Sequence, residues 1–486
     1  MNGDIARVAG LTALTLLGGC SLAPRYEPPH LPLPSSYQGT GLFGPAQPEA
    51  GAALRGDWWT LLGDPELDRL EEALGRANPT LAAAAQTYAQ ARELVNEARS
   101  ALYPQLTAEG SISDNKQSAH RLFRLNPSVG TQESSNIVSA VAAWEPDFWG
   151  DIRSGVSQHK LLAQASAADL ANVRLSLQAE LASEYVALRG LDAELVVLRE
   201  SIATYEKAVE VTRLRATGEI ASGLDLARAQ SQLASAQAQE TETRLQRDLL
   251  QHAVAVLVGE SPSSFALAPT GEFRLRAPEI PAGIPSELLQ RRPDIARSER
   301  QMAAANEAIG IARAAFYPHI TLTGAAGFED DAFNLLSLPN SFWSVGTAAV
   351  LPLIDGGLRQ ARLRRSWSEY EQTRDFYRAT VLSAFQEVED GLTLTHRLQA
   401  ELNQQEQASE QAAQALNIST MLYNDGLDNY LSVSVAQVQA LAARTVEVEV
   451  RARQVQASVA LIRALGGGWS GADLASSGAI HISQLD

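Results

Sequence analysis

The placement of proline limits the possible folds of this chain more than any other sequence feature. The chain has 486 residues and 21 prolines, yet none lies between Pro146 and Pro262 or after Pro352. Because proline breaks helix interiors, both intervals can hold very long helices. Apolar residues recur in the first interval every three or four positions, as at Leu170, Val173, Leu177, Leu181, Tyr185, Leu188, Leu191, Leu195, Leu198, Ile202, Tyr205 and Val209. A helix over about residues 156–215 would be about 90 Å long, which suits a barrel or coiled coil of helices.

Prolines also bracket two short windows with strand character, Pro104–Pro146 and Pro318–Pro352. The predicted strands are Gln105–Ser113, Asn136–Trp144, Ile320–Phe328 and Phe342–Leu351. Their apolar and polar side chains partly alternate, as they do in membrane barrels. No stretch after the N-terminal segment offers 18 uninterrupted apolar residues, so any further membrane crossing must use strands.

The two strand windows sit in duplicated surroundings. Asn78–Pro104 aligns without gaps to Arg292–Pro318, with ten of 27 positions identical. The offset falls from 214 before the strands to 206 after them, so the first copy carries eight extra residues around its loop 116–132. Glycine-containing turns at Gly218 and Gly426 also correspond. Each repeat is therefore expected to run helix, strand pair, long helix, turn, long helix.

Two strands per repeat give four per chain, and four strands cannot close a barrel. An open sheet edge cannot lie in lipid, because its backbone groups would stay unpaired. If these are membrane strands, several chains must share one barrel. Three chains would supply twelve strands, an even number of plausible size.

The first 19 residues are typical of a signal peptide, with Arg7 ahead of the short apolar segment Val8–Leu17. The segment ends in Leu17-Gly18-Gly19-Cys20, which resembles a bacterial lipobox. Cys20 is the only cysteine, and we expect it to be the acylated (palmitate-bearing) first residue of the mature chain. A plain signal peptide with a chance cysteine is the alternative. Because one acyl chain anchors weakly, a second membrane element is expected.

Composition argues against several function classes. The formal net charge of −17 excludes nucleic acid as a partner. The seven His residues show no zinc-site spacing, and no nucleophile elbow or Walker loop is present, so we expect neither an enzyme nor a cofactor or metal site. The pattern at Gly466, Gly468 and Gly471 follows a helix and is interpreted as a helix stop. The pair Glu71-Glu72 is interpreted as a solvated helix surface.

An ordered set of short motifs spans about 450 residues. They are Cys20-Ser-Leu-Ala-Pro-Arg-Tyr26, Trp58-Trp59, Asp64-Pro65-Glu66-Leu67, Arg292-Pro293-Asp294-Ile295, Ala312-Arg-Ala-Ala-Phe-Tyr-Pro318, Gly426-Leu-Asp-Asn-Tyr-Leu431 and Ala464-Leu-Gly-Gly-Gly-Trp469. In this order the chain resembles the outer-membrane factor family, in its OprM/NodT-like lipoprotein branch. The resemblance implies a mainly helical homotrimer whose twelve-stranded barrel joins a periplasmic α-barrel and a mixed equatorial region.

The resemblance also implies a function and partners. The chain would be the outer-membrane channel of a tripartite efflux system, a passive exit duct for drugs or other small toxic compounds. It would be lipid-anchored in the outer membrane, extend into the periplasm and meet a periplasmic adaptor and an inner-membrane pump. The pump is taken to be of the RND type, with MFS and ABC pumps left open. A type I secretion duct and a non-pore lipoprotein scaffold are the alternative functions.

The expected domain organisation follows the repeats. The predicted parts are a signal peptide (1–19), an acylated extended segment (20–64), a first repeat (65–270) with hairpin 105–146, a second repeat (271–469) with hairpin 319–352, and a C-terminal tail (470–486).

Family motifs place the gate of the duct at the second turn. Leu431 matches a leucine constriction, and Asp428, Asp425, Gly426 and Tyr430 are its expected neighbours. The acidic residue common in the family is replaced by Val435, so Asp425 and Asp428 are candidates for a substitute cation-attracting ring. The same carboxylates could instead only solvate or cap a helix. The turn glycines Gly218, Gly223 and Gly426 are predicted to contact the adaptor.

Overall fold

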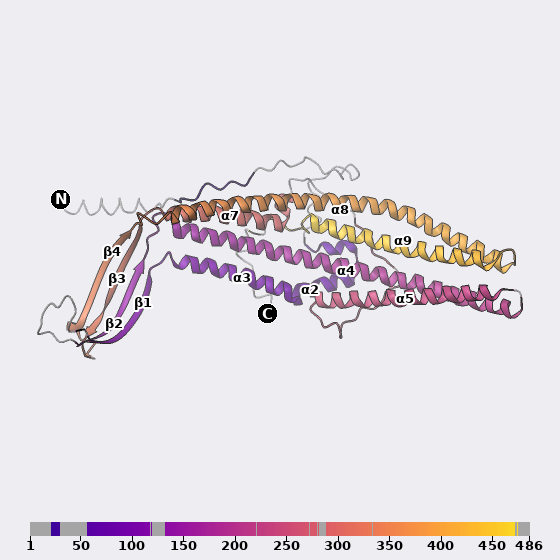
Figure 1. The fold of residues 1–486 in the computed structure, drawn as a ribbon, viewed down its shortest axis with the longest axis horizontal. Coiled ribbons are helices and arrows are strands. Elements are labelled where there is room, and N and C mark those ends of the chain that lie inside the picture. The colour runs from indigo at the N-terminus through magenta and orange to yellow at the C-terminus, as the bar shows by residue number, and fades with distance from the viewer. Residues whose placement is uncertain are drawn as a thin grey trace. The chain divides into compact units, whose positions relative to one another are not determined.

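The computed structural model describes residues 21–29, 56–116, 118, 132–219, 221–271, 273–278, 280, 288–332, 334–471 and 474. The first half contains η3 (Trp58–Leu62), α2 (Pro65–Ala77), α3 (Pro79–Ser100), β1 (Gln105–Lys116), β2 (Gln132–Trp144), α4 (Asp151–Thr217) and α5 (Gly223–Leu257). The second contains α6 (Leu288–Arg291), α7 (Pro293–Ala314), β3 (His319–Asp330), η5 (Leu338–Asn340), β4 (Ser341–Val350), α8 (Leu358–Asn424) and α9 (Tyr430–Ala464). Figure 1 shows this order.

The element order repeats as the duplication predicts. Helices α4 and α8 each have 67 residues, and helices α5 and α9 each have 35. The predicted helix 156–215 is therefore present and extends a few residues further at each end. Its apolar stripe is buried most completely between Leu181 and Tyr205.

The four strands form one antiparallel sheet in the order β1-β2-β3-β4. Three of the four run beyond their predicted bounds, and β4 ends one residue earlier than expected. The two hairpins join through β2 and β3, where Ala140 pairs with Ala326. Strands β1 and β4 are the outer strands of this sheet.

The chain packs into two compact units, and each unit takes segments from both repeats. One unit contains Tyr88–Ser166 and Ser298–Tyr377, which include the sheet. The other contains Ala167–Arg297 and the chain from Arg378, which include both helix turns. Compact packing therefore divides the chain differently from the sequential repeats.

The main hydrophobic core of the second unit lies where α2 meets α4. Helix α2 begins at an N-cap, because Asp64 Oδ1 accepts from the backbone N–H of Glu66 and of Leu67. The Tyr185 hydroxyl on α4 donates to Asp64 Oδ2 at 2.9 Å. Apolar side chains of the two helices fill the space between them, among them Leu67, Leu70, Leu74, Leu181 and Leu188, and Trp58 of η3 joins the same core.

Buried charges fasten the segment after α5 onto α4 and α5. The fully buried carboxylate of Asp192 accepts from Arg189 Nη1 at 2.9 Å and from Arg247 Nε at 2.6 Å. The same two arginines donate to the carbonyl oxygens of Ala268 and Leu267. Because each buried charge has an opposite charge and further hydrogen bonds, its desolvation is compensated.

Candidate functional site

The strand register gives the sheet one mainly apolar face and one more polar face. Residues paired across neighbouring strands point to the same side of a sheet, and successive residues alternate. One side carries Leu106, Ala108, Val138, Ala140, Ala142, Leu322, Ala326, Phe328, Trp343 and Val345. The opposite side is more polar, with Gln105, Thr107, Glu109, Ser111, Ser139, Thr321, Thr323 and Ser344, and it also carries Ile137, Val141, Ala325 and Phe342. This division is that of a membrane strand, apolar toward lipid and polar toward a lumen.

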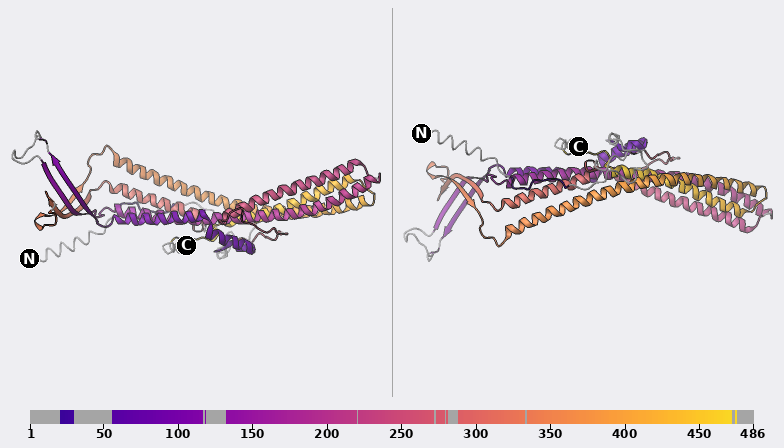
Figure 2. Two further views of the ribbon diagram at one scale, coloured as in Figure 1. Left: turned by 90° about the horizontal axis from the view of Figure 1, so that it is seen from below. Right: turned by 90° about the horizontal axis from the view of Figure 1, so that it is seen from above.

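Both helix turns lie side by side at one end of the second unit (Figures 1 and 2). The second turn ends α8 with Gly426 at a φ of 74°, and the Leu427 N–H donates to the Leu422 carbonyl oxygen. This is a Schellman-type helix end. Helix α9 then begins at Asn429, whose side chain accepts from the backbone N–H of Leu431. Capping thus fixes both ends of the turn.

The first turn uses a different residue for its left-handed position. Gly218 and Gly223 lie where the sequence placed the turn, but the positive φ of 60° belongs to Glu219. Ser222 caps α5 by accepting from the backbone N–H of Asp225. The pairing of Gly218 with Gly426 therefore locates the turn but not its left-handed residue.

Arg215 joins the two turns, and the sequence motifs predicted no role for it. Its guanidinium lies over the Tyr423 ring at 4.4 Å and donates to the carbonyl oxygens of Tyr423 and Asn424 at 2.9 and 3.0 Å. A cation at the carboxyl end of α8 also complements the helix dipole. In the duplication Arg215 and Tyr423 both stand three residues before the turn glycine. Their equivalence in the duplication was the available sequence signal, because the two turns lie side by side.

Tyr430 lies inside the chain and not on its exposed face. The side chain is 2% exposed, packs edge-on against the Tyr423 ring and lies 3.4 Å from Gln437 through its hydroxyl. Burial, with the neighbouring hydroxyls of Tyr423 and Tyr205, raises the pKa of Tyr430 to about 12. Its position suits a residue that supports the turn.

Leu431 is exposed on α9 at 46%, and it begins an apolar stripe. Val435 and Val438 follow at helical spacing with exposures of 48% and 47%. Asp425 is exposed, while Asp428 is half-buried and accepts from the backbone N–H of Asn429. The structure therefore brings Leu431 and the two carboxylates to one turn, and it adds Val438, which the sequence reasoning missed.

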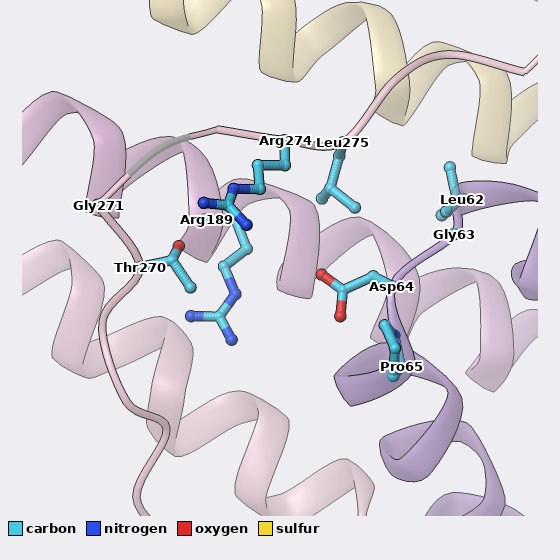
Figure 3. Close-up of a pocket in the computed structure, with 9 residues that line it drawn as sticks. All are labelled: Leu62, Gly63, Asp64, Pro65, Arg189, Thr270, Gly271, Arg274 and Leu275. Atoms are coloured by element: carbon cyan, nitrogen blue, oxygen red, sulfur yellow. The ribbon is translucent and has the colours of Figure 1, made fainter.

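A recess of about 690 Å³ lies beside the α2 N-cap (Figure 3). Asp64, Arg189 and Arg274 supply its charged lining, together with the backbone around Thr270 and Gly271. Asp64 and Arg189 are already committed, since Asp64 caps α2 and Arg189 pairs with Asp192 and lies against the Tyr185 ring. The recess therefore belongs to the packing of α2 on α4.

Glu71 differs from the solvated carboxylate that the sequence predicted. It is 1% exposed and faces the core, and its two carboxylate oxygens have no hydrogen-bond partner among the described residues. Burial, with the neighbouring charge of Asp68, raises the pKa of Glu71 to about 9. The amphipathic turn that buries Leu67, Leu70 and Leu74 carries Glu71 inward with them.

Cys20 and the signal peptide lie outside the described residues, but the segment directly after Cys20 is described. It runs antiparallel along α7: Arg313 Nη1 donates to the Leu22 carbonyl oxygen, Asn306 Nδ2 to that of Pro24, and the Tyr26 hydroxyl to Glu299. Gly310 makes room for the crossing, since a Cβ there would lie 2.8 Å from the Ala23 nitrogen. Ser21 is thereby directed toward the end of α7 that precedes β3.

Over the described residues, every helix lacks an apolar stretch long enough to span a bilayer. Within those same residues, no group of three or more His, Cys, Asp or Glu side chains is arranged to hold a metal ion.

Comparison with known proteins agrees with this architecture. Residues 70–260 and 284–467 match the family described as outer membrane efflux protein. The chain is 31% identical over 471 residues to the pyoverdine export outer membrane protein OpmQ of Pseudomonas aeruginosa, covering 94% of this chain and 96% of that protein. It is 30% identical over 457 residues to the probable efflux pump outer membrane protein TtgC of Pseudomonas putida, covering 93% and 94%.

Solved structures show the same fold. The outer-membrane channel OprN superposes with a TM-score of 0.83 at 26% identity, covering 93% of this chain and all of that one. The Campylobacter jejuni CmeC outer membrane channel gives a TM-score of 0.86 at 21% identity, covering 96% and 99%.

The fold and its two-faced sheet are those of an outer-membrane efflux channel, as the sequence motifs predicted. The chain belongs to the outer membrane efflux protein family. It is the outer-membrane component of an efflux system, and its place is the outer membrane.

Proposed function

We propose that three copies of this chain form one passive exit duct, gated at the paired helix turns and held to the outer membrane by an acyl group on Cys20. The observation that carries the proposal is the four-stranded sheet, with its apolar face, its polar face and its two outer strands β1 and β4. Four strands cannot enclose a lumen, and open edges are costly in lipid. Three sheets joined edge to edge make a closed barrel of twelve strands.

The path of the N-terminal segment supports lipid anchoring. Contacts with Glu299, Asn306 and Arg313 lead the chain along α7 toward the start of β3. An acyl chain on Cys20 would then enter the membrane beside the barrel strands. A single acyl chain binds weakly by itself, and the shared barrel supplies the second membrane element.

The exposed stripe on α9 supports a gate at the turn. Three copies of Leu431 around an axis would form an apolar ring that excludes water and ions. Val435, at the position where the family commonly has an acidic residue, lengthens this apolar ring. Asp425 and Asp428 add carboxylates nearer the turn, which three-fold symmetry multiplies into a cation-attracting mouth.

The paired turns also supply the docking surface for partners. Gly218, Gly223 and Gly426 lie at exposed turn positions where a periplasmic adaptor would bind. The adaptor would couple the duct to an inner-membrane pump of the RND type, which provides the energy. The substrates are drugs or other small toxic compounds, in line with relatives named for efflux and for pyoverdine export.

Conductance of the purified protein in planar bilayers tests the gate. Leu431→Ala should raise the open-channel conductance or open probability several-fold, because it removes the largest apolar side chain from the ring. Val446→Ala is the matched control, an exposed valine about four helical turns further along α9. Equal conductance of the Leu431→Ala variant and the unmodified protein would remove Leu431 from the gate. Absence of any channel from heat-modifiable oligomer would reject the duct.

A further inference from the structure

In each repeat the end of the returning helix, α5 or α9, contacts the start of the helix before the strand pair, α3 or α7, through one side chain and one glycine. In the first repeat the Asn78 amide donates to the carbonyl oxygen of Leu257, the last residue of α5, at 2.8 Å. Gly259 follows with a φ of 76° and lies so close to Ala77 that a Cβ would overlap the Ala77 carbonyl oxygen. We call this contact the first joint.

The second repeat builds the same contact from equivalent positions. Arg292, which aligns with Asn78 in the duplication, donates from Nη1 to the carbonyl oxygen of Ala464, the last residue of α9, at 2.9 Å. Gly466 has a φ of 94°, and a Cβ there would overlap the Arg291 carbonyl oxygen. This is the second joint, and both joints lie within the second compact unit.

The two joints differ in charge. The buried Arg292 guanidinium also pairs with Asp294 on α7 at 2.7 Å and with Glu387 on α8 at 2.8 Å. It therefore ties together the start of α7, the middle of α8 and the end of α9. Asn78 carries no charge, and its side-chain bonds in the described residues go to α5 and to the first turn of α3.

A small tilt of α9 at the second joint produces a large displacement at the second turn, because the helix between them is long. Helix α9 has 35 residues and so extends about 50 Å from the second joint to the turn, at ~1.5 Å per residue. A tilt of about 5° at the base would displace the turn by about 4 Å over that length. A displacement of that size decides whether leucine side chains meet, since apolar contact extends only to about 4.5 Å.

We propose that each joint is the point about which its helix hairpin tilts, and that Arg292 is the positioning residue that holds the α8–α9 hairpin at the angle where its turn closes. Only the second joint bonds to both helices of its own hairpin. Arg292 reaches Glu387 on α8 and Ala464 on α9, whereas the described side-chain bonds of Asn78 reach α5 and not α4. This inference rests on the gate proposed at Leu431, which lies on the same hairpin.

Two substitutions separate the tie to α8 from the joint itself. Glu387→Gln removes the charge on α8 and leaves the Arg292 bond to Ala464 in place. Arg292→Asn gives the second joint the side chain of the first. Both should raise single-channel conductance or open probability in planar bilayers several-fold, measured on the heat-modifiable oligomer, and Glu387→Gln should do so with a Tm close to that of the unmodified protein. Asp390→Asn, one turn further along α8 and exposed, is the matched control and should leave conductance unchanged.

Each outcome is decisive when Leu431→Ala is measured beside these variants. Wild-type conductance in both joint variants, with raised conductance in Leu431→Ala, would overturn the positioning role of Arg292 and still support the gate at Leu431. Wild-type conductance in all three would reject the gate as well. Conductance that rises only in proportion to oligomer loss would show that Arg292 merely holds the fold together. The conductance of Arg292→Lys should lie between those of the unmodified protein and Arg292→Asn. Lysine keeps the positive charge, but it lacks the forked geometry that lets arginine bond to several partners.

Discussion

Glu219 holds a backbone conformation that side chains other than glycine rarely adopt. Its φ of 60° costs about 1 kcal/mol for an L-residue with a Cβ, and glycine would avoid that cost. Glu219→Gly should therefore slow hydrogen exchange of the amides in the first turn. Glu219→Ala, which keeps the Cβ, is the control and should show no such protection. Faster exchange in the glycine variant would mean that Glu219 stabilises the turn by a contact of its own.

Glu71 makes stability depend on pH in a defined window. Burial raises the pKa of its carboxyl from the ordinary value of 4.5 to about 9 in the folded chain, so the folded state binds the extra proton. This stabilising contribution is complete below pH 4.5 and is lost as the pH rises toward 9. Glu71→Gln should thus raise Tm at pH 8 and change it little at pH 4.5. The exposed neighbour Glu72 provides the control variant Glu72→Gln, which should leave the pH profile unchanged.

Among the elements, the join between α4, α5 and the segment after α5 depends on one buried carboxylate. Asp192→Ala would leave Arg189 and Arg247 buried with unbalanced charge, which costs about 3–5 kcal/mol. Chemical denaturation should show a loss of that order. Glu240→Ala is the surface comparison, because its partners Arg199 and Arg244 are half exposed, and these pairs should contribute about 1 kcal/mol or less. Equal losses in the two variants would contradict the buried network.

The helices and strands were largely predictable, because their signals are local and repeated. Proline positions marked the limits of α4 and α8, and the duplication confirmed both. The side-chain network was not predictable in the same way. Helical spacing from Leu67, Leu70 and Leu74 places Glu71 on the apolar face of α2 and Glu72 outside it, but this local pattern does not say that the face is packed closely enough to bury a carboxylate. Arg215 acquires its role from a contact with a residue more than 200 positions away.

At the scale of the whole molecule, the duplication explains why the parts fit. Equal lengths of α4 and α8, and of α5 and α9, bring both turns to the same level, where Arg215 can reach Tyr423. A single ancestral hairpin length would give this match directly. The two repeats differ in charge at Arg292 and Glu387.

Neighbouring residues of β4 test which face of the sheet meets lipid in the assembled duct. Val345 lies on the apolar face and Ser344 on the polar face, one residue apart. Val345→Arg would place a charge against lipid at a cost of about 2–4 kcal/mol near the bilayer centre, so the yield of heat-modifiable oligomer in outer membranes should fall. Ser344→Arg should assemble normally and shift the channel toward anions, because its charge would face the lumen. If Ser344→Arg lost the oligomer while Val345→Arg kept it, the two faces would be assigned the wrong way round. Since the register fixes the relation between all four strands, that one result would reverse the orientation of the entire sheet.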